Sequence, residues 1–186
     1  MTHYLELRVR PDPEFPVNIL LGALVSKLHL ALVHLGANDL GISFPQHEEH
    51  PPLGHMLRLH GTDIRLAELM ETDWLRGLRD HLEIGAVDPV PPGVVHRVVR
   101  RKQYKTNADR LRRRRMKRHG ESYEQASQRI PDTVERKVKT PFVVIRSLSS
   151  GQTFSLFIEH GACQPTAVPG SYNTYGLSKT ATVPWF

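Results

Sequence analysis

One basic segment dominates the charge of this chain. Residues 97–118 read RVVRRKQYKTNADRLRRRRMKR and hold 12 of the 25 lysines and arginines, against a single acid, Asp109. The segment carries about +11 and the remainder about −5, so the net charge of +6 is local. Ordinary surfaces mix both signs. We therefore expect a phosphate-backbone binder here rather than a merely solvated surface helix.

The basic segment contains a predicted helix at residues 108–119. Thr106 and Asn107 can cap its start, and Gly120 is typical of a C-terminal stop. Its few apolar residues form no stripe, so the helix gains little from core packing and needs a polyanion. One face carries Arg110, Arg114, Lys117 and Arg118, with Arg112, Arg113 and Arg115 on its flanks.

Length and composition predict a soluble globular protein. The chain has 186 residues, of which 39% are hydrophobic, enough for a packed core. The longest apolar run, residues 19–25, is too short to span a membrane, and no signal-peptide pattern is present. Cys163 is the single cysteine, which excludes an internal disulfide and fits a reducing cytoplasm. The basic helix lacks an apolar face, which favours nucleic acid over a membrane as the partner.

Hydrophobic periodicity predicts an N-terminal domain at residues 1–90. Strict alternation of apolar and polar residues indicates a strand, and apolar residues that recur every three or four positions indicate a helix. The resulting order β-α-β-β-α-β is the ferredoxin-like motif, an antiparallel sheet backed by two helices. Its predicted elements are strand 3–10, helix 17–35, strand 41–44, strand 56–60, a helix from Thr62 or Asp63 to about Met70, and strand 78–87. For the last segment a helix is the alternative, because Leu75, Leu78 and Leu82 also recur at helical spacing.

A proline-rich linker, residues 88–93, precedes a second predicted domain at residues 94–186. This C-terminal α+β domain bears the arginine-rich helix. Ser122 and Gln125 form the pattern of a capping box, which predicts a further helix ending before Pro131. The remaining predicted elements are a basic strand at 94–103 and a hairpin of strands 141–147 and 153–159.

Histidines are the first candidates for chemistry. His29 lies among apolar residues of the first helix, which favours a packing role, although imidazole is the side chain best suited to move a proton near neutral pH. A second group has the composition of a metal site, but its spacing matches no standard site, so we predict no metal and no cofactor. That group is His47, Glu48, Glu49, His50 and His55.

Four further residues have a functional and a structural interpretation. Arg101 and Gln103 are two apart on a predicted strand, so their side chains share one side and suit recognition of guanine and adenine edges; surface ion pairs are the alternative. Phe154 could stack on a base or fill the core, and Tyr175 has the same ambiguity. Without further context, the core is the favoured interpretation for Phe154.

Several motifs, in order along nearly the whole chain, carry a family resemblance. They are the opening 2–16, Lys27-Leu-His29, Ile42-Ser-Phe-Pro45, the segment 74–82, the arginine helix, Arg129-Ile-Pro-Asp132, the hairpin 142–154, Tyr175-Gly-Leu-Ser-Lys179 and Val183-Pro-Trp-Phe186. Together they resemble the CRISPR-associated repeat-RNA endoribonucleases of the type I-F (Ypest) subtype. Lys117 departs from the family pattern, which usually has arginine at this position. Lysine supplies the positive charge but not the planar guanidinium group that makes bidentate hydrogen bonds.

The resemblance implies a specific enzyme. Such proteins cut precursor CRISPR RNA at the 3′ base of a repeat hairpin without metal, stay bound to the mature crRNA, and belong to a crRNA-guided surveillance complex with other subunits. Matching positions make His29, Ser147 and Tyr175 catalytic, with Ser149 close enough to share the role of Ser147. The implied RNA contacts are Arg101, Gln103, Arg113, Arg114, Lys117, Arg118 and Phe154, to which the face of the predicted helix adds Arg110.

Two alternatives come from another functional class. The protein could be a catalytically inactive subunit that binds hairpin RNA. It could also bind DNA, because residues 108–130 read as helix, turn and helix; against this, the arginines lie on the first helix, whereas that motif reads bases with its second.

Overall fold

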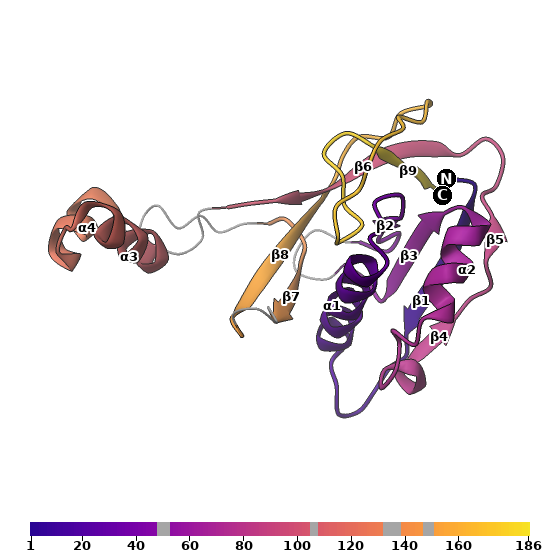
Figure 1. Cartoon of the computed structure of the whole chain (residues 1–186), viewed down its shortest axis with the longest axis horizontal. Coiled ribbons are helices and arrows are strands. Elements are labelled where there is room, and N and C mark those ends of the chain that lie inside the picture. The colour runs from indigo at the N-terminus through magenta and orange to yellow at the C-terminus, as the bar shows by residue number, and fades with distance from the viewer. Residues whose placement is uncertain (48–52, 105–107, 132–138, 147–150) are drawn as a thin grey trace. The chain divides into compact units, whose positions relative to one another are not determined.

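The computed structural model describes residues 1–47, 53–104, 108–131, 139–146 and 151–186 (Figure 1). The chain forms two compact units. The larger consists of residues 1–102 and 140–186, and the smaller of residues 103–139. The fold is α+β, as predicted, with antiparallel sheets and helices. The domain boundary predicted between residues 90 and 94 stays a prediction.

The first sheet is built from the N-terminal part of the chain. Its strands pair antiparallel in the order β2-β3-β1-β4, and β5 adds to one end of β1. The predicted sequence of elements, β-α-β-β-α-β, is present up to β4. The elements are β1 (His3–Val9), α1 (Val17–His34), β2 (Gly41–Ser43), β3 (Met56–Gly61), α2 (Asp63–Glu71), β4 (Leu82–Ile84) and β5 (Asp88–Pro89).

The last strand of this sheet is shorter than predicted. A turn and a 3₁₀ helix (η1, Arg79–His81) occupy the start of the segment that we expected to be a strand from residue 78. Leu75, Leu78 and Leu82 are all buried. Leu75 and Leu78 lie in the turn before the 3₁₀ helix, and Leu82 is the first residue of the short strand, so their spacing reflects neither a regular helix nor a regular strand.

Helix α1 forms the centre of the core. It packs against β1 and also against β7 of the second sheet, and its buried side chains belong to one hydrophobic cluster with both sheets. By length and composition α1 is apolar enough to cross a membrane. Core helices of soluble proteins meet the same two criteria, and most of the apolar residues of α1 are buried in the core, whereas Ile19, Leu30 and Val33 are exposed.

The second sheet comes from the C-terminal half. Its antiparallel strands are β6 (Val95–Lys102), β7 (Phe142–Arg146), β8 (Thr153–His160) and β9 (Thr182–Trp185), in the order β7-β8-β6-β9. The β7–β8 hairpin was predicted. Strand β9 was not, because Pro184 and the turn-rich tail hide a strand that forms only by pairing with β6.

The smaller unit is a pair of helices. Helix α3 spans Ala108–His119, as predicted, and Gly120 follows it with a φ of 66°. Helix α4 (Tyr123–Arg129) starts with the predicted capping box. Ser122 Oγ accepts from the Gln125 amide at 3.2 Å, and the Gln125 side chain accepts from the Ser122 amide at 3.0 Å.

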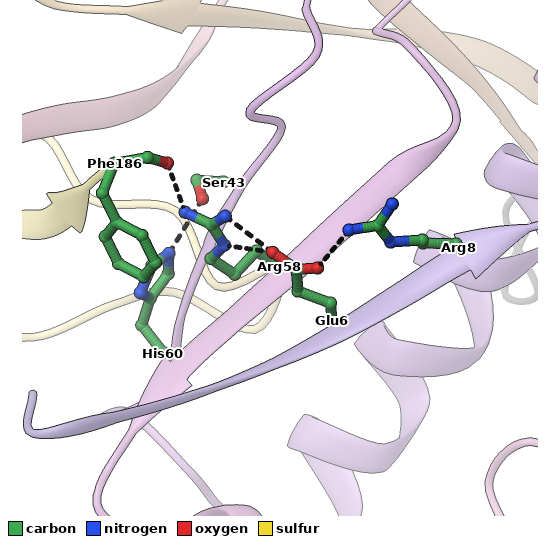
Figure 2. Close-up of polar contacts among 6 residues, drawn as sticks. All are labelled: Glu6, Arg8, Ser43, Arg58, His60 and Phe186. Atoms are coloured by element: carbon green, nitrogen blue, oxygen red, sulfur yellow. Dashed lines mark hydrogen bonds and ion pairs between the residues drawn. The ribbon is translucent and has the colours of Figure 1, made fainter. Parts of the chain in front are cut away.

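A buried arginine fixes the C-terminal residue to the first sheet (Figure 2). Arg58 on β3 donates twice to Glu6 Oε1 on β1, at 3.0 and 2.6 Å, and once to the Phe186 carbonyl at 2.7 Å. Its guanidinium carbon lies 3.9 Å from the centre of the Phe186 ring. Burial raises the pKa of Glu6, but hydrogen bonds from Arg8 and Arg58 outweigh it and leave that pKa below its ordinary value.

Candidate active site and nucleic-acid interface

His29 is held by a turn from the far end of the chain. It lies half-buried on α1, and its Nδ1 is 2.9 Å from the Thr174 carbonyl oxygen. The Tyr175 ring stacks on the imidazole, with centroids 4.0 Å apart and planes 4° apart. The structure thus brings two predicted catalytic residues, His29 and Tyr175, into direct contact.

The carbonyl of Thr174 determines which tautomer His29 adopts. A carbonyl oxygen only accepts hydrogen bonds, so Nδ1 must carry the proton in this contact. A neutral imidazole then has its lone pair on Nε2, and this nitrogen can accept a proton from a neighbouring hydroxyl. The arrangement suits a general base whose ring is fixed on one side by a hydrogen bond and on one face by an aromatic ring.

The turn itself is attached to β2. The Ile42 amide donates to the Gly176 carbonyl at 2.9 Å, and the Tyr172 amide donates to the Asn38 carbonyl at 2.8 Å. Gly176 has a φ of 69°, and a Cβ there would lie 2.7 Å from Ile42 Cγ2. Only glycine fits this position, because a side chain would meet both the left-handed backbone and β2.

Two predicted site residues cannot be placed. Ser147 and Ser149 lie outside the described residues, so their predicted roles stay predictions. The strand that leads toward them, β7, is described up to Arg146.

The predicted base-reading residues are partly brought together. Arg101 on β6 lies over Phe154 on β8, with its guanidinium carbon 5.6 Å from the ring centre. Phe154 is half-buried and packs on the core, while Arg101 is exposed. Gln103 is exposed, but β6 ends one residue earlier, at Lys102. The argument that Arg101 and Gln103 point to the same side of a strand therefore does not apply to Gln103.

Helix α3 separates its basic residues into two sets. At about 100° per residue, one set spans an arc of about 140°. All its members are exposed, and they are the residues predicted to bind RNA: Arg110, Arg113, Arg114, Lys117 and Arg118. We call these five residues the basic face of α3.

The other set stabilises the helix pair. Arg112 is 7% exposed, donates to the Ile130 carbonyl at 2.9 Å and to Asp109 at 3.1 Å, and lies over the Tyr123 ring. Arg115 donates twice to Glu121, at 2.6 and 2.8 Å. These contacts join α3 to α4 and orient the basic face away from α4. The sequence places both on the flanks of the predicted basic face together with Arg113, and only the structure separates them from Arg113.

Three basic residues of the segment make contacts within the second sheet. Arg100 and Lys102 both pair with Glu159 on the adjacent strand. Arg97 donates to the His160 and Gly161 carbonyls, and its guanidinium lies 4.3 Å from the Trp185 ring centre. The charge available to a polyanion is therefore smaller than the sequence suggests, and its densest part is the basic face of α3.

Of the histidine group with the composition of a metal site, the structure describes His47 and His55. His47 stacks on His160, with ring centroids 3.9 Å apart, and its Nδ1 lies 3.0 Å from the Phe44 carbonyl. Burial lowers the pKa of His160 to about 3, with smaller effects from His47 and Arg97. Glu48, Glu49 and His50 lie outside the described residues. Within the described part of the chain, no three His, Cys, Asp or Glu side chains are grouped to hold a metal.

Comparison with known proteins identifies the family. The family model of a CRISPR-associated protein (Cas_Csy4) matches residues 4–186. The chain belongs to this family. The subtype resemblance carried by the sequence motifs is thereby confirmed.

Two curated relatives extend the family match over full length. The chain is 51% identical over 187 residues to the CRISPR-associated endonuclease Cas6/Csy4 of Pseudomonas aeruginosa (strain UCBPP-PA14) and 45% identical over 186 residues to the protein of the same name from Escherichia coli (strain UTI89 / UPEC). The alignments cover 100% of this chain and of both relatives.

Sequence reasoning missed the residues that support the site. Thr174 contributes only its backbone carbonyl, which carries no sequence signature. Asn173 accepts from the Tyr175 and Leu177 amides at 2.8 and 3.2 Å. An Asn followed by a Gly three residues later is a turn signal, and it could have marked the segment as a defined turn rather than an irregular tail.

Proposed function

We propose that this protein is a metal-independent endoribonuclease that cleaves precursor CRISPR RNA at the 3′ base of the repeat hairpin. The observation that carries the proposal is the fixed imidazole of His29, bonded through Nδ1 to Thr174 and stacked on Tyr175. The names of the two relatives, both CRISPR-associated endonucleases, support the reaction class.

The basic face of α3 is the proposed site for the RNA hairpin. Exposed guanidinium and ammonium groups within one arc of the helix can contact successive phosphates across a groove. The major groove of A-form RNA is too deep and narrow for side chains to read along its length. We therefore propose that α3 contacts the stem near its end, with Arg101 and Gln103 at the last base pairs and Phe154 stacking beside them.

The proposed reaction is an internal transesterification. His29 Nε2 removes the proton from the ribose 2′-hydroxyl, and the resulting oxygen attacks the adjacent phosphorus in line. The P–O5′ bond breaks, which gives a 2′,3′-cyclic phosphate and, after protonation of the leaving oxygen, a 5′-hydroxyl. General-base catalysis of this kind contributes roughly 10²- to 10⁴-fold to the rate. In this proposal Ser147 holds the 2′-hydroxyl in position, and Ser149 shares this role.

A substrate with one 2′-deoxyribose at the cut site tests the chemistry. Binding is expected to persist and cleavage to disappear, because the nucleophile is missing. Cleavage of the unmodified RNA is expected to continue in excess EDTA and to yield a 2′,3′-cyclic phosphate. Cleavage of the deoxy substrate, or loss of activity in EDTA, would contradict the proposed reaction.

His29→Ala distinguishes the enzyme from a non-catalytic hairpin binder. The variant is expected to bind the repeat hairpin with the affinity of the wild type and to cleave it at least 10²-fold more slowly. Absence of cleavage by both proteins, with tight binding by both, would favour the binding subunit. Equal affinity for duplex DNA of the same sequence would favour the DNA-binding alternative.

We also propose that the protein keeps the mature crRNA and acts with it in the cytoplasm as a subunit of a type I-F surveillance complex. Slow product release follows if the basic face and the base-reading residues contact only the stem, because cleavage at its 3′ base leaves those contacts intact. RNA sequenced from the purified protein is expected to end at the base of the hairpin.

A further inference from the structure

The carboxamide of Asn173 organises the turn that contacts His29. Its Oδ1 accepts two backbone hydrogen bonds, from the Tyr175 amide at 2.8 Å and the Leu177 amide at 3.2 Å. The backbone of Asn173 closes the same turn, since its amide donates to the Leu177 carbonyl at 2.9 Å and its carbonyl accepts from Gly176 at 2.8 Å. Asn173 thus makes four hydrogen bonds within one five-residue turn.

This turn contains both groups that fix the imidazole. Thr174, directly after Asn173, presents the carbonyl that accepts from His29 Nδ1, and Tyr175 presents the stacked ring. The orientation of the Thr174 carbonyl is set by the peptide between residues 174 and 175, and the amide of that same peptide is the one bonded to Asn173 Oδ1. A rotation of this peptide would therefore break both hydrogen bonds together.

We propose that Asn173 is a positioning residue for His29. By holding the 174–175 peptide, it keeps His29 in the tautomer with the proton on Nδ1 and the lone pair on Nε2. The side chain acts through the backbone and not on RNA. The proposal rests on the proposed function only where it concerns the cleavage rate; the effect on the tautomer is independent of it.

The direct test is the tautomer of His29 in Asn173→Ala. Alanine removes the acceptor for both amides, so the peptide is free to rotate and water can replace the Thr174 carbonyl. In ¹⁵N–¹H correlation spectra of the imidazole nitrogens, the wild type is expected to show His29 protonated on Nδ1 when neutral. Asn173→Ala is expected to show a mixture of tautomers. The His29 signals are assigned by their loss in His29→Ala.

Cleavage kinetics give a second readout. Under single-turnover conditions Asn173→Ala is expected to cleave the repeat hairpin at least 10-fold more slowly, because misplacement of a catalytic group by about 1 Å costs up to 10²-fold. Its affinity for RNA is expected to stay at the wild-type value. Asn173→Asp keeps an acceptor oxygen of the same reach and is expected to restore both the tautomer and most of the rate.

A matched control removes an equivalent turn elsewhere. Asp12 Oδ1 accepts from the Glu14 and Phe15 amides at 2.8 and 2.9 Å, and the Asp12 carboxylate also contacts His81. Asp12→Ala therefore loses at least as many side-chain contacts as Asn173→Ala. It is expected to lower thermal stability while leaving the His29 tautomer and the cleavage rate unchanged.

Two outcomes would overturn the proposal. One is an Asn173→Ala protein with the wild-type tautomer. The other is a rate loss in Asn173→Ala that Asp12→Ala reproduces, since this would indicate general destabilisation. The proposed function fails separately: if His29→Ala cleaves as fast as the wild type, His29 is not the base, whatever its tautomer.

Discussion

Arginine residues of this protein differ sharply in what surrounds them. Arg58 and Arg112 are 6% and 7% exposed, as buried as many core leucines, whereas Arg113 and Arg114 are exposed on the basic face of α3. The buried pair is surrounded by carboxylates, carbonyls and aromatic rings of the protein itself. Removing such a buried arginine leaves its partners unpaired, whereas removing Arg113 or Arg114 takes away a charge from the exposed surface of the helix.

Replacing Arg58 tests this distinction for the first sheet. Arg58→Met removes one of the two cations that bind the largely buried Glu6, together with the contacts to Phe186, so the free energy of unfolding is expected to fall by about 3 kcal/mol at neutral pH. Urea unfolding measures it. Arg8→Met is the matched control: Arg8 binds the same carboxylate at 2.8 Å but is 45% exposed, and its loss is expected to cost less than about 1 kcal/mol.

The effect of Arg58→Met should also depend on pH. The pKa of Glu6 is lowered in the fold, so the ionised carboxylate contributes stability above the ordinary glutamate pKa of about 4.3 and loses it as pH falls through the folded value. The difference between wild type and Arg58→Met is therefore expected to be largest at neutral pH and to shrink below about pH 4. A difference that grows on acidification would contradict this account of Glu6.

Two elements, α1 and β7, approach each other unusually closely. A Cβ at Gly22 on α1 would lie 2.4 Å from the Val144 carbonyl oxygen on β7. Glycine is unfavourable inside a helix by about 1 kcal/mol relative to alanine. Its presence here lets the helix that carries His29 pack directly on the backbone of the second sheet.

The effect of Gly22→Ala on the melting temperature shows whether close packing or helix propensity dominates at this position, because the two change the melting temperature in opposite directions. Overpacking costs about 1–3 kcal/mol and exceeds the gain in propensity, so the melting temperature is expected to fall by several degrees. A rise in melting temperature, as in an exposed helix, would show that α1 and β7 are not in this contact. Val33→Ala, at an exposed position of the same helix, serves as a control for the effect of helix propensity alone.

The α3–α4 pair allows the two arginine sets to be separated by adjacent substitutions. Arg112→Ala removes the bonds to Ile130 and Asp109, so amide exchange across residues 108–130 is expected to quicken at least 10-fold. Arg113→Ala is expected to leave exchange unchanged and to weaken RNA binding, with the slope of log affinity against log salt reduced by about 1. Equal effects of the two substitutions on exchange would contradict this division.

For the whole molecule, the asymmetry of charge is the property that matters for binding. Glu159 and Glu121 neutralise part of the basic segment within the fold, and the basic face of α3 keeps its charge exposed. Such a surface attracts a polyanion at long range and makes association dependent on ionic strength. The remaining acidic part of the chain disfavours contact with the same polyanion elsewhere.

Salt dependence measures how many phosphates the whole protein neutralises. If about six are contacted, log affinity for the repeat hairpin is expected to fall against log salt with a slope of roughly −4 to −5. Fluorescence anisotropy between 50 and 500 mM salt, on the catalytically inactive His29→Ala, gives the slope without cleavage. A flat response would contradict the role of the basic face of α3.

Most of the helices and strands, and the family, could be predicted from the sequence alone. Helix 108–119, the Ser122–Gln125 capping box and the β7–β8 hairpin follow from spacings of two to four residues, because the periods of helices and strands are local. Tertiary structure decided which groups meet across the chain. The Thr174 carbonyl and His29 are 145 positions apart, and no pattern marks a backbone carbonyl; likewise, only packing shows that Arg112 is buried beside an exposed Arg113. Local patterns report periodicity, whereas partners of buried polar groups are set by which segments the core brings together.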